Sequence, residues 1–159
     1  MRVLIVCQAN TARSVMAQLL LERMLRERGA DGRVTVRSAG VGRWARDRML
    51  VSHDARIALR DEGIHLGEDD FASTALQAHP ELLAEADLVV AMTAEQVHVV
   101  KELAAGRTLS IVTLRELAGE EGDIGDPVNQ GEEVFRACCA EIKRCLVKVV
   151  DHLLPPPIG

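Results

Sequence analysis

Residues Val3–Val6 form an uninterrupted aliphatic run, and this run constrains the fold more than any other segment. A strand with one wet face alternates apolar and polar residues, so a continuous run indicates a strand covered on both faces. A polar loop follows at once. Apolar residues then recur at helical spacing from Ser14 to Arg28, and Gly29 is a natural helix end. A buried strand joined to a helix predicts βαβ units and a parallel sheet.

The same alternation continues along the chain. We expect further strands at 33–37, 87–92 and 109–114, helices at 52–62, 94–105 and 131–153, and a helical turn at 81–84. The apolar stripe of the last helix consists of Val134, Cys138, Ile142, Leu146, Val149 and Leu153. The sequence therefore predicts one α/β domain over residues 1–154. This domain is an open sheet of four parallel strands with helices on both faces, followed by a Pro-rich tail at 155–159.

Charge and composition narrow the classes of partner. The formal net charge of −5 argues against nucleic acid. The apolar runs are too short for a membrane span or for the core of a signal peptide. The 4 cysteines show neither the density of a disulfide scaffold nor zinc-site spacing. We therefore expect a cytoplasmic protein with free thiols and no membrane partner.

Basic residues are concentrated between positions 33 and 60. This stretch suggests either steering of an acidic protein partner or a solvated surface. Its arginines are Arg33, Arg37, Arg43, Arg46, Arg48, Arg56 and Arg60.

The loop between the first strand and the first helix runs from Cys7 to Ser14. Ligands of open α/β sheets bind outside the carboxyl ends of the strands, where the free N–H groups and dipole of a helix attract an anion. Consecutive backbone N–H groups can also surround a tetrahedral oxyanion. We therefore expect this loop to cradle a phosphate group. The residues that would surround it are Gln8, Ala9, Asn10, Thr11, Ala12 and Ser14.

Four side chains of this loop suit catalysis. The positive field favours the ionised thiol of Cys7, which can then attack phosphorus. Arg13 can grip two phosphate oxygens with its planar fork. Ser14 can donate its hydroxyl to the thiolate, and Asn10 tolerates the left-handed backbone that a tight loop needs.

The Cys-x5-Arg spacing by itself is weak, because the chain contains it twice. Cys138 and Arg144 have the same spacing but lie inside the last predicted helix, with no strand before them. We interpret this second copy as structural, with a packed Cys138 and a solvated Arg144. The strand, the loop and the helix start distinguish the first copy.

Hydrolysis also needs a proton donor for the leaving group and later a base for water. Asp126, in an acidic loop before the last helix and followed by Pro127, is the candidate. Asp123 is its rival. A plain turn is the alternative interpretation, because Asp-Pro and Gly are common in turns.

With these features in place, the chain resembles the low-molecular-weight protein tyrosine phosphatase family over nearly its whole length. The resemblance lies in residues 7–14, 38–40, 85–92 and 123–127. It implies a phosphorylated protein substrate, a phosphocysteine intermediate, and no metal or other cofactor. By the same resemblance Cys7 is the nucleophile, Arg13 the phosphate-binding arginine and Asp126 the general acid, while Asn10, Ser14 and Ser38 form a hydrogen-bond network that holds the loop.

Two residues point to different substrates. Thr11 resembles the bacterial protein-arginine phosphatase branch, in which threonine replaces a bulkier aliphatic residue. Trp44 resembles the aromatic wall of tyrosine-specific members, with core packing as the alternative. Because an aromatic ring stacks on a phenol and on a guanidinium plane, Trp44 leaves phosphotyrosine and phosphoarginine both open.

Three departures from the family pattern affect the site. Ala12 stands where many members have a second cysteine that protects the nucleophile, which predicts irreversible oxidation of Cys7. Ala9 occupies a usual glycine position, where we expect a tightened or distorted loop. Val128 and Asn129 replace aromatic residues, so the cleft lacks one wall.

Two other functions compete with a phosphatase. Arsenate reductases that are coupled to thioredoxin share this loop, but they need two relay cysteines. Cys138 and Cys145 are about 10 Å apart along a helix, and the neighbours Cys138 and Cys139 rarely bridge. A catalytically weak phosphoprotein-binding module is the second rival, supported only by Ala9 and Val128.

Overall fold

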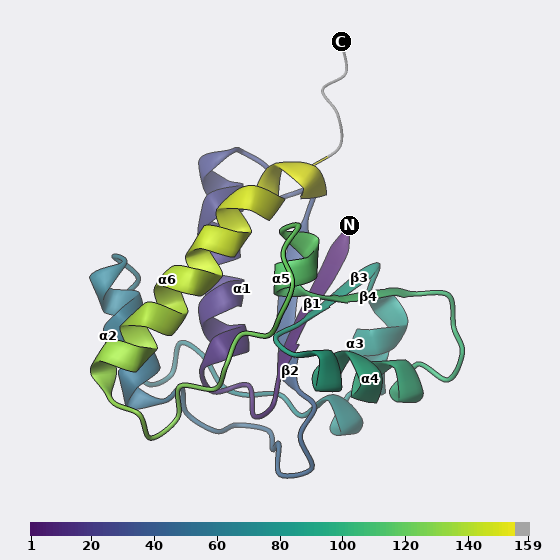
Figure 1. The fold of residues 1–159 in the computed structure, drawn as a ribbon, viewed down its shortest axis with the longest axis horizontal. Coiled ribbons are helices and arrows are strands. Elements are labelled where there is room, and N and C mark those ends of the chain that lie inside the picture. Colours follow the sequence, from purple (N-terminus) through teal and green to yellow (C-terminus); the bar gives the residue numbers. More distant parts are fainter. Residues whose placement is uncertain (155–159) are drawn as a thin grey trace.

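The computed structural model describes residues 1–154, which form a sheet with helices on both faces (Figure 1). The strands are β1 (Arg2–Cys7), β2 (Thr35–Gly40), β3 (Leu88–Ala91) and β4 (Ser110–Thr113). All neighbouring strands pair in parallel, in the order β2-β1-β3-β4. The predicted α/β class, strand number and strand direction are confirmed.

The helices form two layers around this sheet. Figure 1 shows α1, α2 and α6 over one face, and α3 and α4 over the other. The main helices are α1 (Arg13–Glu27), α2 (His53–Asp61), α3 (Pro80–Glu85), α4 (Ala94–Leu103) and α6 (Glu132–Val149). Three short elements complete the described chain: α5 (Leu114–Leu117), and the 3₁₀ turns η1 (Leu76–Ala78) and η2 (Val150–Leu153).

Strand β1 explains why the sheet needs two helical layers. Its side chains alternate between two separate cores: Val3 and Ile5 pack under α1 and α6, whereas Leu4 and Val6 pack on the side of α3 and α4. All four are almost completely buried. A strand with two buried faces has no position for a polar side chain, which is why its sequence is continuously apolar.

The strand order places a binding site at the end of β1. The chain leaves β1 toward β2 on one side, and returns to β3 and β4 on the other. The connections therefore diverge beside β1, and a crevice opens at the carboxyl end of such a strand. Cys7 is the last residue of β1.

Most observed boundaries lie within two residues of the expected ones, and the larger differences are at β2 and α6. Strand β2 starts later and reaches Gly40, so that Ser38 lies inside the strand. Helix α6 tightens into a 3₁₀ turn after Val149. On α6, Val134 was expected in the apolar stripe but is 37 % exposed, and Phe135 is buried in its place, because the first turn of the helix presents that position to the core. Neither α5 nor η1 was expected.

Two further expectations concern the tail of the chain and membrane spans. The Pro-rich tail at 155–159 lies outside the described residues. Among residues 1–154, no helix combines the length and apolar character needed to cross a bilayer.

Candidate active site

The Cys7 sulfur lies at the carboxyl end of β1, and two hydrogen-bond donors face it. Its Sγ is 2.9 Å from the hydroxyl oxygen of Ser14. The backbone N–H of Asn10 also donates to Sγ, at 3.4 Å. Cys7 is only 3 % exposed. Donors directed at a sulfur stabilise its ionised form over its neutral form.

Asn10 organises this loop through both its backbone and its side chain. Its φ of 61° is left-handed, as expected for asparagine in a tight turn. The side-chain amide donates to the hydroxyl oxygens of Ser14 at 2.7 Å and Ser38 at 2.9 Å. Its carbonyl oxygen accepts the backbone N–H of Thr74 at 2.9 Å. Because the Ser14 oxygen accepts from Asn10, the hydroxyl proton of Ser14 is free to point at the sulfur.

The expected network of Asn10, Ser14 and Ser38 is therefore present, and it extends to two further residues. Ser38 donates to the side-chain carbonyl of Gln18 on α1. Sequence reasoning missed Gln18 although it lies four residues after Ser14, and positions four apart share a helix face. The contact of Thr74 with Asn10 had no local signal in the sequence, because it joins two distant loops.

The N-terminus of α1 points at this loop and is open to an anion. Ala12 occupies the N-cap position, and no side chain within residues 1–154 caps the first turn. The first turn also lacks acidic residues. The free N–H groups and the positive end of the helix dipole can therefore act on a bound oxyanion.

A second loop, residues 40–52, lies against the phosphate loop. The backbone N–H of Gly42 donates to the Gln8 carbonyl at 2.8 Å, and that of Ser52 donates to the Thr11 carbonyl at 2.9 Å. A side chain at Gly40 would collide with the backbone of Ala9, at 2.8 Å. Ala9 itself does not have the positive φ that favours glycine, so the alanine fits this loop without backbone strain.

Arg13 connects the phosphate loop to the acidic loop before α6. Its Nη1 donates to the carbonyl of Ile124 at 2.8 Å, and its Nη2 lies 3.7 Å from Oδ2 of Asp126. The Arg13 side chain is 5 % exposed, whereas that of Asp126 is 50 % exposed. The fold thus brings Asp126 to the mouth of the site, with its carboxylate open to solvent or to a leaving group.

Asp123 has a different position. Its Oδ1 accepts the backbone N–H of Ala94, the first residue of α4, at 2.9 Å. A carboxylate at a helix N-terminus satisfies free N–H groups and interacts favourably with the dipole. This structural role leaves Asp126 as the better-placed acid.

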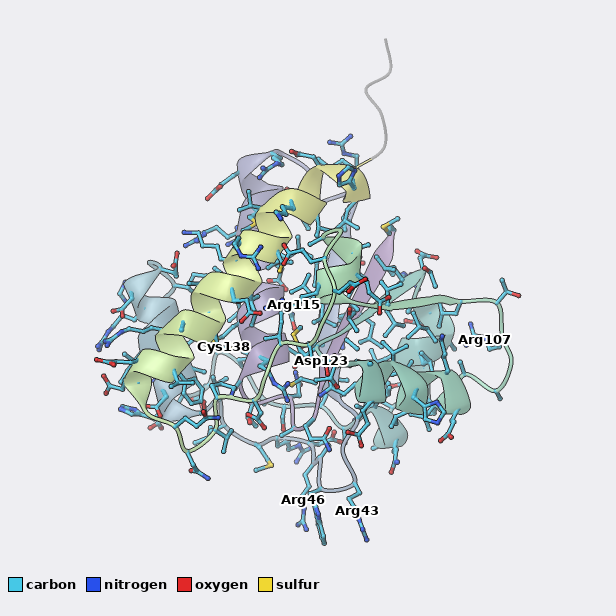
Figure 2. All side chains as sticks on the ribbon, viewed as in Figure 1. Arg43, Arg46, Arg107, Arg115, Asp123 and Cys138 are labelled. Carbon is cyan, nitrogen blue, oxygen red and sulfur yellow. The ribbon has the colours of Figure 1, made fainter. Side chains whose placement is uncertain are left out.

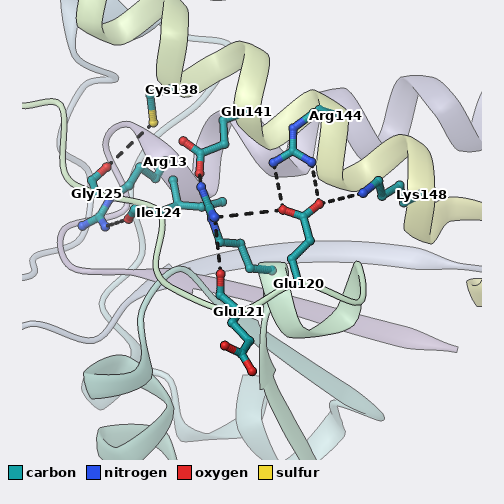
Figure 3. A network of polar contacts seen from close by, with 10 residues as sticks. Arg13, Glu120, Glu121, Ile124, Gly125, Cys138, Glu141, Arg144 and Lys148 are labelled. Atoms are coloured by element: carbon teal, nitrogen blue, oxygen red, sulfur yellow. Dashed lines mark hydrogen bonds and ion pairs between the residues drawn. The ribbon is translucent and has the colours of Figure 1, made fainter.

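A network of polar contacts fastens the acidic loop to α6 (Figure 3). Arg115 pairs with Glu141 of α6 and donates to the Glu121 carbonyl at 3.3 Å. Glu120 pairs with Arg144 and Lys148, and the hydrogen bond from Arg144 is the main reason that its pKa falls to about 2. Arg144 is therefore an ion-pair partner, and not the freely solvated residue that the sequence suggested.

The three cysteines of α6 are buried free thiols. Cys138 contacts the Gly125 carbonyl at 3.9 Å, beneath the acidic loop. Burial raises the pKa of Cys138 to about 12 and that of Cys139 to about 11. Thiols that stay protonated are poor nucleophiles, so they are unsuited to relay a disulfide from Cys7.

The candidates for contact with the substrate side chain are less buried than Cys7 and Arg13. Trp44 is 73 % exposed, so core packing is wrong for this residue. The Arg43 guanidinium lies 5.2 Å from the centre of its ring. Thr11 is half-buried and Val128 is 46 % exposed. In Figure 2, Asp123 and Cys138 lie in the body of the molecule, whereas Arg43 and Arg46 project from its lower edge.

Comparison with known proteins places this arrangement among phosphatases. The low molecular weight phosphotyrosine protein phosphatase family matches residues 2–154. The protein-arginine-phosphatase of Geobacillus stearothermophilus is 32 % identical over 153 residues, covering 96 % of this chain and 95 % of that protein. The low molecular weight protein-tyrosine-phosphatase YfkJ of Bacillus subtilis (strain 168) is 29 % identical over 144 residues, covering 89 % of this chain and 88 % of the relative.

Solved structures agree with the sequence relatives. A mutant of YwlE from Bacillus subtilis superposes with a TM-score of 0.85 at 31 % identity, covering 96 % of this chain and 98 % of that one. A YwlE arginine phosphatase variant with a phosphorylated active-site serine has the same TM-score at 30 % identity, covering 96 % and 95 %. By sequence and by fold, this chain belongs to the low molecular weight phosphotyrosine protein phosphatase family.

Proposed function

We propose that this chain is a cysteine-dependent phosphatase of phosphorylated protein side chains, with Cys7 as nucleophile. The observation that carries the proposal is the sulfur of Cys7 lying 2.9 Å from the Ser14 hydroxyl oxygen, beside the uncapped start of α1. This combination places a nucleophile and a positive cradle side by side.

In the first step, phosphate oxygens bind the backbone N–H groups of residues 8–12 and the fork of Arg13. The Cys7 thiolate attacks phosphorus in line, forming a P–S bond as the P–O or P–N bond to the leaving group breaks. Asp126 gives its proton to the departing oxygen or nitrogen. Preorganised donors around the transferring oxygens provide the largest share of the rate enhancement.

In the second step, Asp126 accepts a proton from water. The water oxygen attacks phosphorus while the P–S bond breaks, which restores the thiolate and releases inorganic phosphate. The Ser14 hydroxyl and the Asn10 N–H are placed to receive the negative charge returning to sulfur. Their contacts favour the departure of sulfur as a leaving group.

For the substrate, we propose phosphoarginine ahead of phosphotyrosine. Thr11 is small and polar, and the exposed Val128 offers no aromatic surface. A guanidinium group can hydrogen-bond to a hydroxyl and to Asp126, whereas a phenol ring gains most from stacking. Phosphotyrosine is the second candidate, because the exposed ring of Trp44 can stack on a phenol as well as on a guanidinium plane. Protein-arginine-phosphatases among the relatives add support.

Four free cysteines suit a reducing compartment, so we propose the cytoplasm as the location. The proposed function is tested by release of phosphate from matched phosphoarginine and phosphotyrosine peptides. Cys7→Ser should abolish turnover of both. Thr11→Ile should shift the preference toward phosphotyrosine by about 10-fold or more, because one buried contact of a few kcal/mol suffices. Turnover that survives Cys7→Ser would refute the proposed nucleophile.

A further inference from the structure

The arginine loop, residues 42–51, differs in charge from the rest of the protein. Residues 33–60 contain seven arginines and two aspartates, whereas the whole chain carries a formal net charge of −5. In this loop Arg43, Arg46 and Arg48 are all exposed. Figure 2 shows Arg43 and Arg46 projecting away from the body of the protein.

Within residues 1–154, these cations have no carboxylate partners, although Arg43 lies over the ring of Trp44. Most arginines elsewhere in the chain form ion pairs with carboxylates. Within residues 1–154, none of the three arginines of the loop lies within 4.0 Å of a carboxylate oxygen. An acidic protein that leaves its cations unpaired on one loop keeps a local positive field there.

The arginine loop is held in a defined shape. Ser73 fastens its middle: the backbone N–H of Arg48 donates to the Ser73 carbonyl at 2.9 Å, and that of Met49 donates to the Ser73 hydroxyl at 2.8 Å. Asp47 accepts the backbone N–H of Ala75 at 2.8 Å. These anchors lower the entropy cost of binding, because the loop is ordered before a partner arrives.

Its position connects this charge to the reaction. At the start of the loop, the backbone N–H of Gly42 donates to the Gln8 carbonyl. Just after its end, the backbone N–H of Ser52 donates to the Thr11 carbonyl. Both attachments are to residues of the phosphate loop. The arginine loop therefore borders the site where a phosphorylated residue would bind, within reach of the chain that flanks that residue. Exposed Trp44 and Leu50 add apolar contact area there.

We propose that the arginine loop binds Asp- or Glu-rich sequence flanking the phosphorylated residue of a protein substrate. This inference rests on the proposed function and names its substrate class. Carboxylates are the groups that these guanidinium forks recognise, and an acidic flank is also attracted by the positive field of this loop on a protein that is acidic in total. Each carboxylate that pairs with a guanidinium strengthens ground-state binding and speeds encounter.

The test compares two peptides with the same central phosphorylated residue, flanked by either glutamate or lysine. We expect kcat/KM for the glutamate peptide to exceed that for the lysine peptide by about 10-fold or more at low salt, with a smaller ratio at high salt. In the Arg43→Gln/Arg46→Gln double variant the ratio should fall toward one. The matched control is Arg26→Gln/Arg33→Gln, which removes two exposed, unpaired charges at the opposite end of α1 and β2 and should keep the wild-type ratio.

The outcomes separate the two proposals. Equal kcat/KM for both peptides in the wild-type protein, with normal turnover of a small aryl phosphate, overturns the role of the arginine loop and leaves the phosphatase intact. If the Arg26→Gln/Arg33→Gln control also loses the preference for the glutamate peptide, the preference comes from net charge. This result too overturns the role of the arginine loop. If the Cys7→Ser protein binds anionic vesicles more tightly than the glutamate peptide, the arginine loop is a lipid-binding surface, and the proposal is overturned. Absence of turnover on every phosphorylated compound refutes the proposed function itself.

Discussion

The hydroxyl oxygen of Ser14 lies 2.9 Å from the sulfur of Cys7, and the same oxygen accepts a hydrogen bond from the Asn10 side chain. An oxygen that already accepts from one neighbour still has its own proton to donate. When the sulfur is ionised it has no proton to give, so the contact then has one direction, with the Ser14 hydroxyl as donor and the sulfur as acceptor. This polarity favours the thiolate both before attack and when the phosphocysteine is hydrolysed.

Ser14→Ala should slow release of the thiolate from the phosphocysteine. We expect kcat to fall by about 10- to 100-fold, since one donor to the developing charge is lost. A burst of aryl leaving group should become visible because the second step then limits turnover. Ser14→Thr, which retains the hydroxyl, and the exposed Ser110→Ala serve as controls. An unchanged kcat for Ser14→Ala would contradict the role of this hydroxyl.

Arg13→Lys should reduce kcat/KM by about 10²- to 10³-fold. An ammonium group cannot bind two phosphate oxygens with a planar fork while it also holds the Ile124 carbonyl. Steady-state kinetics with an aryl phosphate measures the effect. Arg26→Lys, on the exposed end of the same helix, should retain full activity. A variant at position 13 that keeps most of its kcat would show that the fork is dispensable.

Asp126→Asn should discriminate between leaving groups. We expect a loss of about 10²- to 10⁴-fold for substrates with poor leaving groups, and little loss for good ones, because only the former need the proton. The matched control is Asp123→Asn, which keeps an oxygen to accept the Ala94 N–H. Equal loss across a series of aryl phosphates would point to another acid.

Oxidation tests the consequence of Ala12. In the wild-type protein, peroxide should inactivate Cys7 in a way that thiol reductants reverse only in part, because position 12 offers no second thiol and the other cysteines are free and buried in α6. Ala12→Cys should convert most of this loss into a reversible one by forming a disulfide with Cys7. Mass spectrometry of the Cys7 peptide measures the irreversible fraction. Full recovery of the wild-type protein would show that the missing cysteine is unimportant.

The ion pairs of Glu120 make a pH-dependent contribution to stability. Because hydrogen bonds from Arg144 and then Lys148 lower its pKa from 4.5 to about 2, this stabilisation is complete above pH 4.5 and disappears as the pH falls toward 2. Glu120→Gln should therefore lower Tm at neutral pH, with the difference shrinking in acid and at high salt. The exposed Glu68→Gln is the control. A Tm difference that does not vary with pH would contradict the ion-pair origin.

Local patterns in the sequence determined the fold class and pointed to the position of the proposed nucleophile. The uninterrupted apolar run of β1 indicates cover on both faces, and a loop followed by a helix start after Cys7 favours anion binding. Both inferences rest on neighbouring residues in the chain. Asn10 could be assigned a left-handed turn for the same reason. The exposure of Trp44 could not be predicted, since an aromatic residue in a loop suits a core or a surface equally well.

Tertiary packing alone decided how the distant parts of the site meet. Arg13 and Asp126 lie far apart in the sequence, and they come together because α6 holds the acidic loop through Glu120, Arg115 and their partners. The choice of Asp126 over Asp123 depends on which carboxylate accepts the N–H at the start of α4, and that carboxylate is Asp123. At the start of α6, Phe135 faces the core and Val134 does not. Such contacts depend on the relative placement of whole elements, which hydrophobic periodicity does not encode.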